Sequence, residues 1–377
     1  MDAPRDALEA LRRASVRSPA DPAPWRRLGR AYLHRGDLCA AERALARAHA
    51  LDLGDRETLQ RLHALVPRYA RWEAQPVPPT PGARYRRLLA AHPLRAEVLV
   101  ELEPGVVALL DVANGAVRVR LGGFDRQVYA AAIDPGGRRL ALSPDDHTTR
   151  LYDLEGGTPL ALLRELGHAL EVAFSADGRL LAAARADALA WWTVLDARPW
   201  IEPRGNVIGP TGPRTPLRLV DGIDHPFVHA GEGRAVWWFA GNGAGRIVAR
   251  SAGAARVPSI WVVAAEAAAA VLDGAPPAGI PLHVAWDAPW VSFAPNPLVV
   301  AVAQPAVDLS GLGLHGGEPG EVRFFDATSG AALGEIAADA PCAFLPSTGQ
   351  LVTDCVGRGL LCWSCQAAPG NATMSGA

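Results

Sequence analysis

The last three quarters of the chain repeat a pattern of strand, turn and strand, and this repeat narrows the possible folds more than any other feature. Four segments share an apolar strand, a turn with Pro or Gly, and a second apolar strand: AAIDPGGRRLALS, VAFSADGRLLAAA, VSFAPNPLVVAV and AFLPSTGQLVTD. Aligned on Ile133, Phe174, Phe293 and Phe344, they are spaced by 41, 119 and 51 residues. The middle spacing is close to three periods of about 40 residues. This predicts an all-β array of similar units.

A second element recurs with the same units, an apolar strand that ends in an acidic residue before a turn. It occurs at Leu110-Asp111, Tyr152-Asp153, Leu195-Asp196 and Phe325-Asp326. The pattern resembles the WD40 repeat, whose third strand ends in Trp-Asp before the outer strand of a propeller blade. The Gly-His pair typical of that family is missing, except at Gly167-His168. The resemblance covers residues 95–366 and implies a WD40-like β-propeller.

The number of blades follows from the spacing of these units. The gap between Phe174 and Phe293 leaves room for two weaker blades, around Leu217–Val248 and Pro258–Leu272, and residues 97–121 supply a shortened blade ahead of Ile133. The sum is seven blades, with six as the nearest alternative.

The first quarter of the chain has the spacing of paired helices. In residues 22–55, large and small apolar residues recur at helical intervals, and Gly36-Asp37 forms the turn between two helices: Trp25, Leu28, Gly29, Tyr32, Ala41, Leu45 and Ala48. These spacings resemble a tetratricopeptide (TPR) repeat, although Leu53 replaces its usual closing proline. The residues before and after 22–55 fit two half repeats of the same pattern. Because about three repeats are needed for an independent fold, this array should lean on the rest of the chain or on a partner.

The domain boundaries follow from composition. We expect a TPR-like helical module at residues 1–74, a proline-rich linker with a short helix around Leu88 and Leu89 at 75–94, the propeller at 95–366, and a disordered tail at 367–377. The fold class is therefore multidomain, an all-α N-terminal part followed by an all-β propeller.

Composition excludes several partners and indicates a source. Lys+Arg 37 against Asp+Glu 39 leaves no basic field to hold nucleic acid or an anionic membrane. All the basic residues are arginine, which removes Schiff-base and P-loop lysine chemistry and, with abundant Ala, Gly and Pro, suggests GC-rich bacterial coding. The N-terminus has no apolar signal region and no apolar run reaches the roughly 20 residues of a membrane helix, so we expect a cytoplasmic protein.

Motifs that mark enzymes either do not occur or lack their usual context. Gly-x-Ser-x-Gly occurs nowhere in the chain. The glycines of 311–316 and 241–246 precede strands rather than the helix that a dinucleotide site needs. His225 and His229 are spaced for zinc only on a helix, and Pro226 argues for a turn. We therefore predict no catalytic residues, no cofactor and no bound metal, and interpret the protein as not being an enzyme.

The cysteines and paired tryptophans have a packing interpretation. Cys362 and Cys365 form a C-x-x-C pair at the end of a β segment rather than at a helix start, so we expect core thiols. Zinc held with Cys342 and Cys355 is the open alternative. Trp191-Trp192 and Trp237-Trp238 are expected to pack between blades rather than to form ligand platforms.

The candidate binding residues lie on the first helix of the TPR-like repeat. Arg26 and Arg30 are four residues apart, off the apolar stripe, at positions that the resemblance places in the concave groove, and Gln60 is the equivalent of Arg26 in the next half repeat. Two guanidinium groups on one turn can bind a peptide carboxylate or acidic side chains. The competing interpretation is a solvated basic face.

Three functions remain open from the sequence. The first is a non-catalytic protein–protein interaction scaffold or adaptor whose partners are other proteins or acidic peptide segments, a reading based partly on fold analogy. The second is an enzyme or small-molecule sensor that uses the central channel of the propeller. The third is a subunit that needs its complex to fold, which predicts poor solubility for residues 1–75 alone.

Overall fold

The computed structural model describes residues 3–365 apart from a set of internal segments: 82–84, 164–168, 170, 175–177, 186–187, 195–200, 209–228, 232–234, 242–244, 252–257, 265–278, 283–289, 305–319 and 356–358. Several sequence predictions lie outside the described residues: Gly167-His168, Leu195-Asp196, His225, the glycines of 311–316 and the tail 367–377. No helix in the described part is long and apolar enough to cross a membrane.

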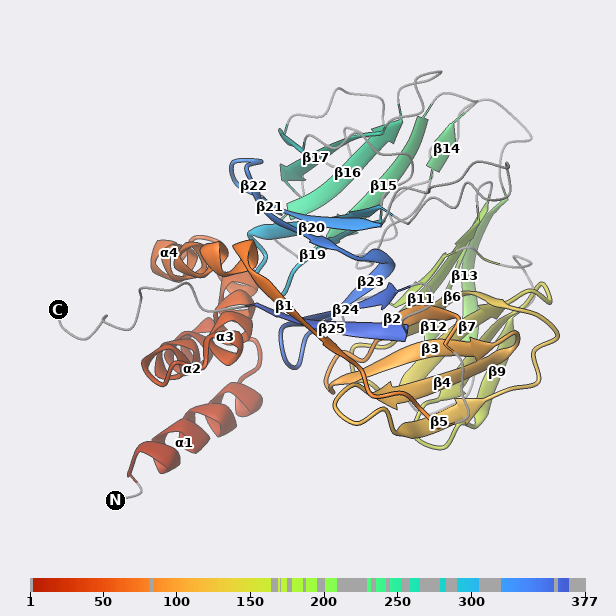
Figure 1. The fold of residues 1–377 in the computed structure, drawn as a ribbon, viewed down its shortest axis with the longest axis horizontal. Coiled ribbons are helices and arrows are strands. Elements are labelled where there is room, and N and C mark those ends of the chain that lie inside the picture. Colours follow the sequence, from red (N-terminus) through yellow and green to blue (C-terminus); the bar gives the residue numbers. More distant parts are fainter. Residues whose placement is uncertain are drawn as a thin grey trace.

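Four α-helices form the N-terminal part, followed by one 3₁₀ turn: α1 (Ala3–Arg17), α2 (Pro22–His34), α3 (Leu38–Leu51), α4 (Arg56–Leu65) and η1 (Val66–Ala70). Asp21, Asp37 and Asp55 each cap the start of the helix that follows. Helices α2 and α3 approach closely at Gly29, where an added Cβ would lie 2.7 Å from Leu45 Cγ. The helical hairpin expected over residues 22–55 is confirmed, and the four helices stack in order along one side of the molecule (Figure 1).

The described strands after the helices form six antiparallel sheets. The first three are β2–β5 (Arg87–Ala91, Glu97–Glu103, Val106–Asp111, Val117–Leu121), β6–β9 (Val128–Ile133, Arg139–Pro144, Thr149–Asp153, Pro159–Leu163) and β10–β13 (Glu171–Phe174, Leu180–Arg185, Ala188–Val194, Ile201–Ile208). The fourth and fifth are β14–β18 (His229–Gly231, Ala235–Gly241, Gly245–Ser251, Pro258–Ala264, Gly279–Leu282) and β19–β22 (Trp290–Phe293, Val299–Gln304, Glu321–Asp326, Ala332–Ala337). The sixth joins β1 (Trp72–Pro76) to β25 (Gly359–Cys365), β24 (Gln350–Cys355) and β23 (Asp339–Leu345).

Neighbouring sheets meet through their inner strands, as blades of a propeller do. The last sheet contacts the β2–β5 sheet through β23 and β2, and the next contacts along the chain are β2 with β6 and β6 with β10. On its other side, the last sheet contacts the β19–β22 sheet through β23 and β19, and β19 contacts β15 (Figure 1). Alternate residues of one strand bury against opposite neighbours, since Val98 and Val100 pack toward the last sheet and Leu99 toward the β6–β9 sheet. A strand buried on both faces explains why these segments are nearly continuous apolar runs.

The acidic turns predicted from the sequence are present where the structure describes them. Asp111, Asp153 and Asp326 end β4, β8 and β21, and each accepts a backbone N–H of the following turn, from Ala113, Gly156 and Thr328 respectively. The chain then enters the outer strands β5, β9 and β22. The physical role of the recurring aspartate is therefore to close the turn into the outer strand.

Two sequence predictions about the start of the propeller are wrong. Leu88 and Leu89, expected in a short helix, lie in β2 and pack into the cores on opposite sides of their sheet. A short apolar run does not distinguish a helical turn from a buried strand. The sheet of residues 87–121 consequently has four strands and is not shortened. In addition, β1 crosses the predicted boundary at residue 74 and pairs with β25 in the last sheet.

The two blades expected around 217–248 and 258–272 also differ from the structure. The described strands from these stretches, β15, β16 and β17, hydrogen-bond to one another within a single five-stranded sheet. Residues 209–228 are outside the described part.

Candidate functional site

The predicted binding residues lie on a surface formed by α2 and the start of α4, which we call the α2–α4 surface. Arg26 and Arg30 are one turn apart on α2. The Arg26 guanidinium lies 2.9 Å from Asp55 Oδ2 and 3.7 Å from Asp52 Oδ2, and Arg30 forms an ion pair with Glu57. The two arginines therefore share one surface, as the spacing predicted, but each already has a carboxylate partner from α4 or from the loop before it.

Asp55 is the anchor of this surface. Its carboxylate accepts the backbone N–H groups of Glu57 and Thr58 at 3.1 and 3.2 Å, and the Thr58 hydroxyl at 2.5 Å. Desolvation alone would raise the pKa of Asp55, but the hydrogen bonds from Thr58 and the Arg26 guanidinium outweigh it and lower the pKa to about 2. Asp55 thus caps α4 and fixes Arg26 at the same time.

The outer part of the surface is more open. Glu57 accepts hydrogen bonds from both Arg30 and Arg61, the latter at 2.8 Å. The hydrogen bond from Arg61, together with the charges of Arg30 and Arg61, lowers the pKa of Glu57. Two guanidinium groups therefore share one carboxylate, which leaves a net positive charge of one on this group of three residues. Gln60 is exposed on the same helix as Glu57 and Arg61.

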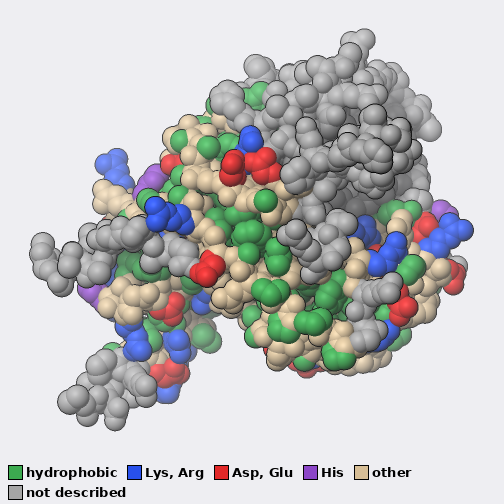
Figure 2. All heavy atoms as spheres, viewed as in Figure 1, with side chains coloured by type: hydrophobic (Ala, Val, Ile, Leu, Met, Phe, Trp, Pro, Cys, Tyr) green, Lys and Arg blue, Asp and Glu red, His purple; other side chains and the backbone are tan. Residues whose placement is uncertain are grey.

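Sequence reasoning found Arg26, Arg30 and Gln60 but missed the residues that organise them, Asp55, Glu57 and Arg61. A signal was present, since the string DRET supplies an Asp followed two residues later by Glu at the expected start of the next helix. Figure 2 shows acidic and basic side chains lying next to one another over the helices, whereas hydrophobic side chains gather over the sheets at the centre of the view.

We predict that the Asp55 carboxylate makes stability depend on pH. Because its pKa is lower in the folded protein than the usual value near 4, its contribution is fully present above pH 4 and is lost as pH falls toward 2. Asp55→Asn keeps a capping side chain but removes the charge, and should lower the free energy of unfolding by about 1–2 kcal/mol at pH 7. Urea unfolding of both proteins at pH 7, 4 and 2.5 measures this difference. A difference that stays constant down to pH 2.5 would contradict the assignment.

The helices are held against the propeller by a buried polar network. Tyr69 is fully buried and donates its hydroxyl proton to Glu42 Oε2 at 3.0 Å, while the Tyr69 hydroxyl oxygen accepts the backbone N–H of Asn296 at 3.3 Å. The Asn296 side-chain amide donates to the Leu62 carbonyl at 3.0 Å. Arg68 Nη1 lies 3.7 Å from Glu42 Oε2. Burial raises the pKa of Glu42, although Arg68 and Tyr69 act in the opposite direction.

An apolar core surrounds this network and is shared by both parts of the chain. Residues from α3, α4 and η1 pack with residues of the β19–β22 sheet and of the last sheet: Leu45, Leu62, Leu65, Val66, Val299, Phe324, Ile336 and Leu351. The expectation that the helical array leans on something else is met by the rest of the chain. The α2–α4 surface is consequently carried on a module that is packed on the propeller.

The cysteines and tryptophans singled out in the sequence are buried in the core wherever the structure describes Cys342, Cys362 and Trp192. Cys342 and Cys362 are buried in the core, and burial raises the pKa of Cys362 to about 11, so the packing interpretation is confirmed for these two. Trp192 is buried as expected. The side chains of Cys355, Trp191, Trp237, Trp238 and His229 lie outside the described part. Among the described residues, no group of three or more His, Cys, Asp or Glu side chains is placed to bind a metal.

Comparison with known proteins identifies the fold. No protein-family profile matches the chain, and no curated protein matches its sequence. Among solved structures, the β-propeller domain of Cps50 (Swd1) from Myceliophteria thermophila matches with a TM-score of 0.53 and 13% identity, over 78% of this chain and 100% of that one. Kuenenia stuttgartiensis hydrazine synthase matches with a TM-score of 0.51 and 11% identity, over 75% and 96%. The chain thus has a β-propeller fold preceded by four helices.

Proposed function

We propose that this protein is a non-catalytic interaction scaffold in which a TPR-like module presents a peptide-binding surface next to a WD40-like propeller. The observation that carries the proposal is the packing of α3, α4 and η1 on the propeller through one buried network and one apolar core. A shared core of this kind holds two surfaces in a fixed relation, which is what a scaffold requires.

Within this function, the α2–α4 surface binds a peptide carboxylate. Arg30 and Arg61 both donate to Glu57, yet each guanidinium carries five N–H donors, so Glu57 does not exhaust them. Their side chains are about two-fifths exposed, 42% for Arg30 and 37% for Arg61. A carboxylate from an acidic peptide can bridge the two groups in the bidentate manner that arginine favours. Gln60, which is exposed on the same helix as Arg61, supplies an amide for the peptide backbone.

Affinity capture from native cell extract tests this function. The bait is the full-length chain, compared with an Arg30→Ala, Gln60→Ala double variant. Arg26 stays in place because its guanidinium also holds Asp55. We expect at least one captured protein to be reduced more than tenfold by the double variant, because the bound carboxylate loses its charge-assisted hydrogen bonds.

The matched control for this experiment is an Arg13→Ala, Arg17→Ala double variant. Both arginines are exposed on α1, away from the α2–α4 surface. The control should capture the same proteins as the wild type. Identical capture by all three baits would remove the α2–α4 surface from the proposed function, and capture of no protein by the wild type would overturn the scaffold itself.

A further inference from the structure

The proline-rich segment between the helices and the propeller has an unusually restricted backbone. It reads QPVPPTP over residues 75–81, with prolines at four positions: Pro76, Pro78, Pro79 and Pro81. The proline ring fixes φ at about −65°, and a residue that precedes proline is held in extended backbone. Every residue of 75–81 meets one of these two conditions. The segment is therefore set to form a polyproline II helix, which has three residues per turn and no hydrogen bonds of its own.

One face of this segment is bound to the propeller. Val77 is buried, and its backbone N–H donates to the Leu360 carbonyl at 3.0 Å, which continues the pairing of β1 with β25. The Thr80 hydroxyl donates to the Gly115 carbonyl at 2.7 Å, and the Thr80 backbone N–H donates to the Tyr85 hydroxyl at 2.9 Å. Val77 and Thr80 are one turn of polyproline II helix apart, so they share the inward face.

Residues 76–81, which we call the proline strap, cross from the last sheet to the first. Leu360 belongs to β25, and Gly115 lies in the turn between β4 and β5 (Figure 1). The approach at Gly115 is close, since a Cβ added there would collide with the Pro78 carbonyl oxygen. Contacts at both ends of the strap hold it in place. Its conformation is therefore set before any partner binds, which lowers the entropy cost of binding.

The other two faces of the strap carry its prolines outward. Pro76 and Pro79 are one turn apart, and both are exposed. On the third face, Pro81 is exposed and Pro78 is half-buried. The strap thus holds two overlapping P-x-x-P pairs in a segment, 75–81, that has no charged side chain. Grooves lined by aromatic side chains recognise polyproline II helices through such pairs.

We propose that the proline strap is a ligand for a partner domain whose groove is lined by aromatic side chains, with Pro76, Pro79 and Pro81 as the residues that enter the groove. The aromatic rings of the partner pack on the proline rings, and a Tyr or Trp of the groove donates a hydrogen bond to a backbone carbonyl of the strap. This inference goes beyond the proposed function, in which the α2–α4 surface receives a peptide, because here the chain itself supplies the peptide.

Binding of purified polyproline-binding domains to the full-length chain tests this inference. The probes are a panel of SH3, WW and EVH1 domains, each titrated into the protein and measured by calorimetry. We expect at least one domain to bind, and its affinity to fall about tenfold or more in a Pro76→Ala, Pro79→Ala double variant, because two ring contacts are lost. A synthetic peptide of residues 73–82 should compete for the same domain, and the peptide with the same two substitutions should not.

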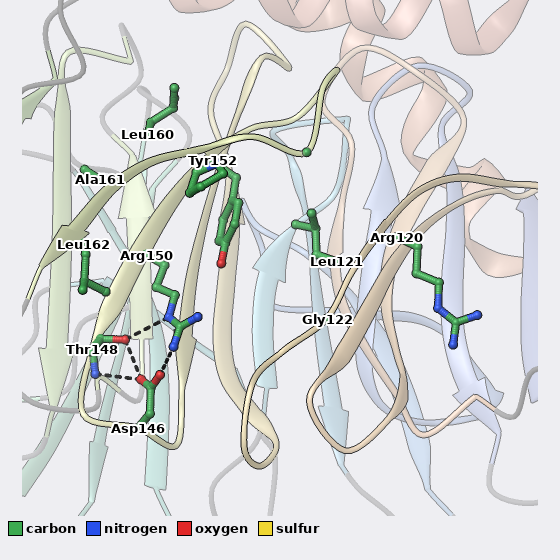
Figure 3. Close-up of a pocket in the computed structure, with 12 residues that line it drawn as sticks. Arg120, Leu121, Gly122, Asp146, Thr148, Arg150, Tyr152, Leu160, Ala161 and Leu162 are labelled. Atoms are coloured by element: carbon green, nitrogen blue, oxygen red, sulfur yellow. Dashed lines mark hydrogen bonds and ion pairs between the residues drawn. The ribbon is translucent and has the colours of Figure 1, made fainter.

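The matched control is a Pro104→Ala, Pro159→Ala double variant. Both prolines are exposed and lie outside the strap. Pro104 is in the turn between β3 and β4, and Pro159 begins β9 and lines the pocket between two blades that Figure 3 shows. The control should bind the same domain with the affinity of the wild type.

Three results would overturn this inference: no domain of the panel binds, the strap variant binds as well as the wild type, or the control loses binding to the same extent. If binding instead survives in the strap variant and is lost in Arg30→Ala, the α2–α4 surface is the site. The proposed function then stands while the strap is excluded as a ligand.

Discussion

Replacing Tyr69 with alanine should lower the free energy of unfolding of the whole chain by about 3–5 kcal/mol, the usual cost of removing a large buried aromatic ring. Tyr69 is fully buried, packs edge-to-face with Trp72 at 5.7 Å between ring centres, and lies 6.3 Å from Phe324 of the propeller. The substitution leaves a cavity where the helices meet the β19–β22 sheet. It also removes the hydroxyl that links Glu42 to Asn296.

Urea unfolding followed by two signals measures this effect. Circular dichroism at 222 nm reports the helices, and tryptophan fluorescence reports chiefly the propeller. Because both parts share one core, we expect the two signals to change in a single transition that shifts to lower urea in the variant. Tyr69→Phe is the matched control. It keeps the ring and removes only the hydroxyl, so the expected loss is about 1–3 kcal/mol.

The opposite outcome would be a helical signal that unfolds at lower urea than the fluorescence in the wild type. That result would mean that the helical module and the propeller are separate folding units. A shared core would then no longer hold their two surfaces in a fixed relation.

A second large effect is expected at Glu101, which joins two blades. Glu101 is 2% exposed, and its carboxylate accepts the backbone N–H of Val128 in the neighbouring sheet at 3.0 Å. Arg87 lies 3.6 Å from the same carboxylate and donates to the Val128 carbonyl. Glu101→Ala leaves a buried N–H without an acceptor and Arg87 without its counter-charge. We expect a loss of about 2–4 kcal/mol in the free energy of unfolding.

Two further variants isolate the cause. Glu101→Gln keeps an acceptor for Val128 and should cost about half as much, because only the charge is lost. Glu103→Ala removes the exposed partner of Arg120 two residues further along β3 and should change stability by less than about 1 kcal/mol. Equal losses for Glu101→Ala and Glu103→Ala would show that Glu101 does not brace the blades.

The sequence predicted those parts of the fold that repeat or that depend on neighbouring residues. The aspartates that end β4, β8 and β21 were recognisable because each closes a turn with residues directly after it. The α2–α3 hairpin was predictable because Gly29 and Leu45 occupy fixed positions in a helical period. By contrast, Leu88 and Leu89 form too short an apolar run to distinguish a strand from a helical turn, and the strand partner of β2 decides it.

The contacts that join distant segments were not predictable from one sequence. Tyr69 and Asn296 are separated by 227 residues, and no local pattern marks either as a partner of the other. The pairing of Arg26 and Arg30 with Asp55 and Glu57 was only partly predictable. All four residues lie in or next to helices that the sequence indicates, but no local pattern joins the two pairs. The spacing of Arg26 and Arg30 indicated that they share one side of α2, but the acids that pair with them follow only from where α4 lies relative to α2.

In the proposed function, the α2–α4 surface of an intact scaffold binds an acidic peptide segment of another protein. The most direct measurement places a photo-crosslinking amino acid at Gln60 of the full-length chain, with Leu94 on the propeller as the control position, and identifies the products in native extract by mass spectrometry. We expect a crosslinked protein that is specific to position 60, is attached within a segment rich in Asp or Glu, and disappears when Arg30→Ala is added. Crosslinks at position 60 that match those at position 94, or that persist without Arg30, would contradict it.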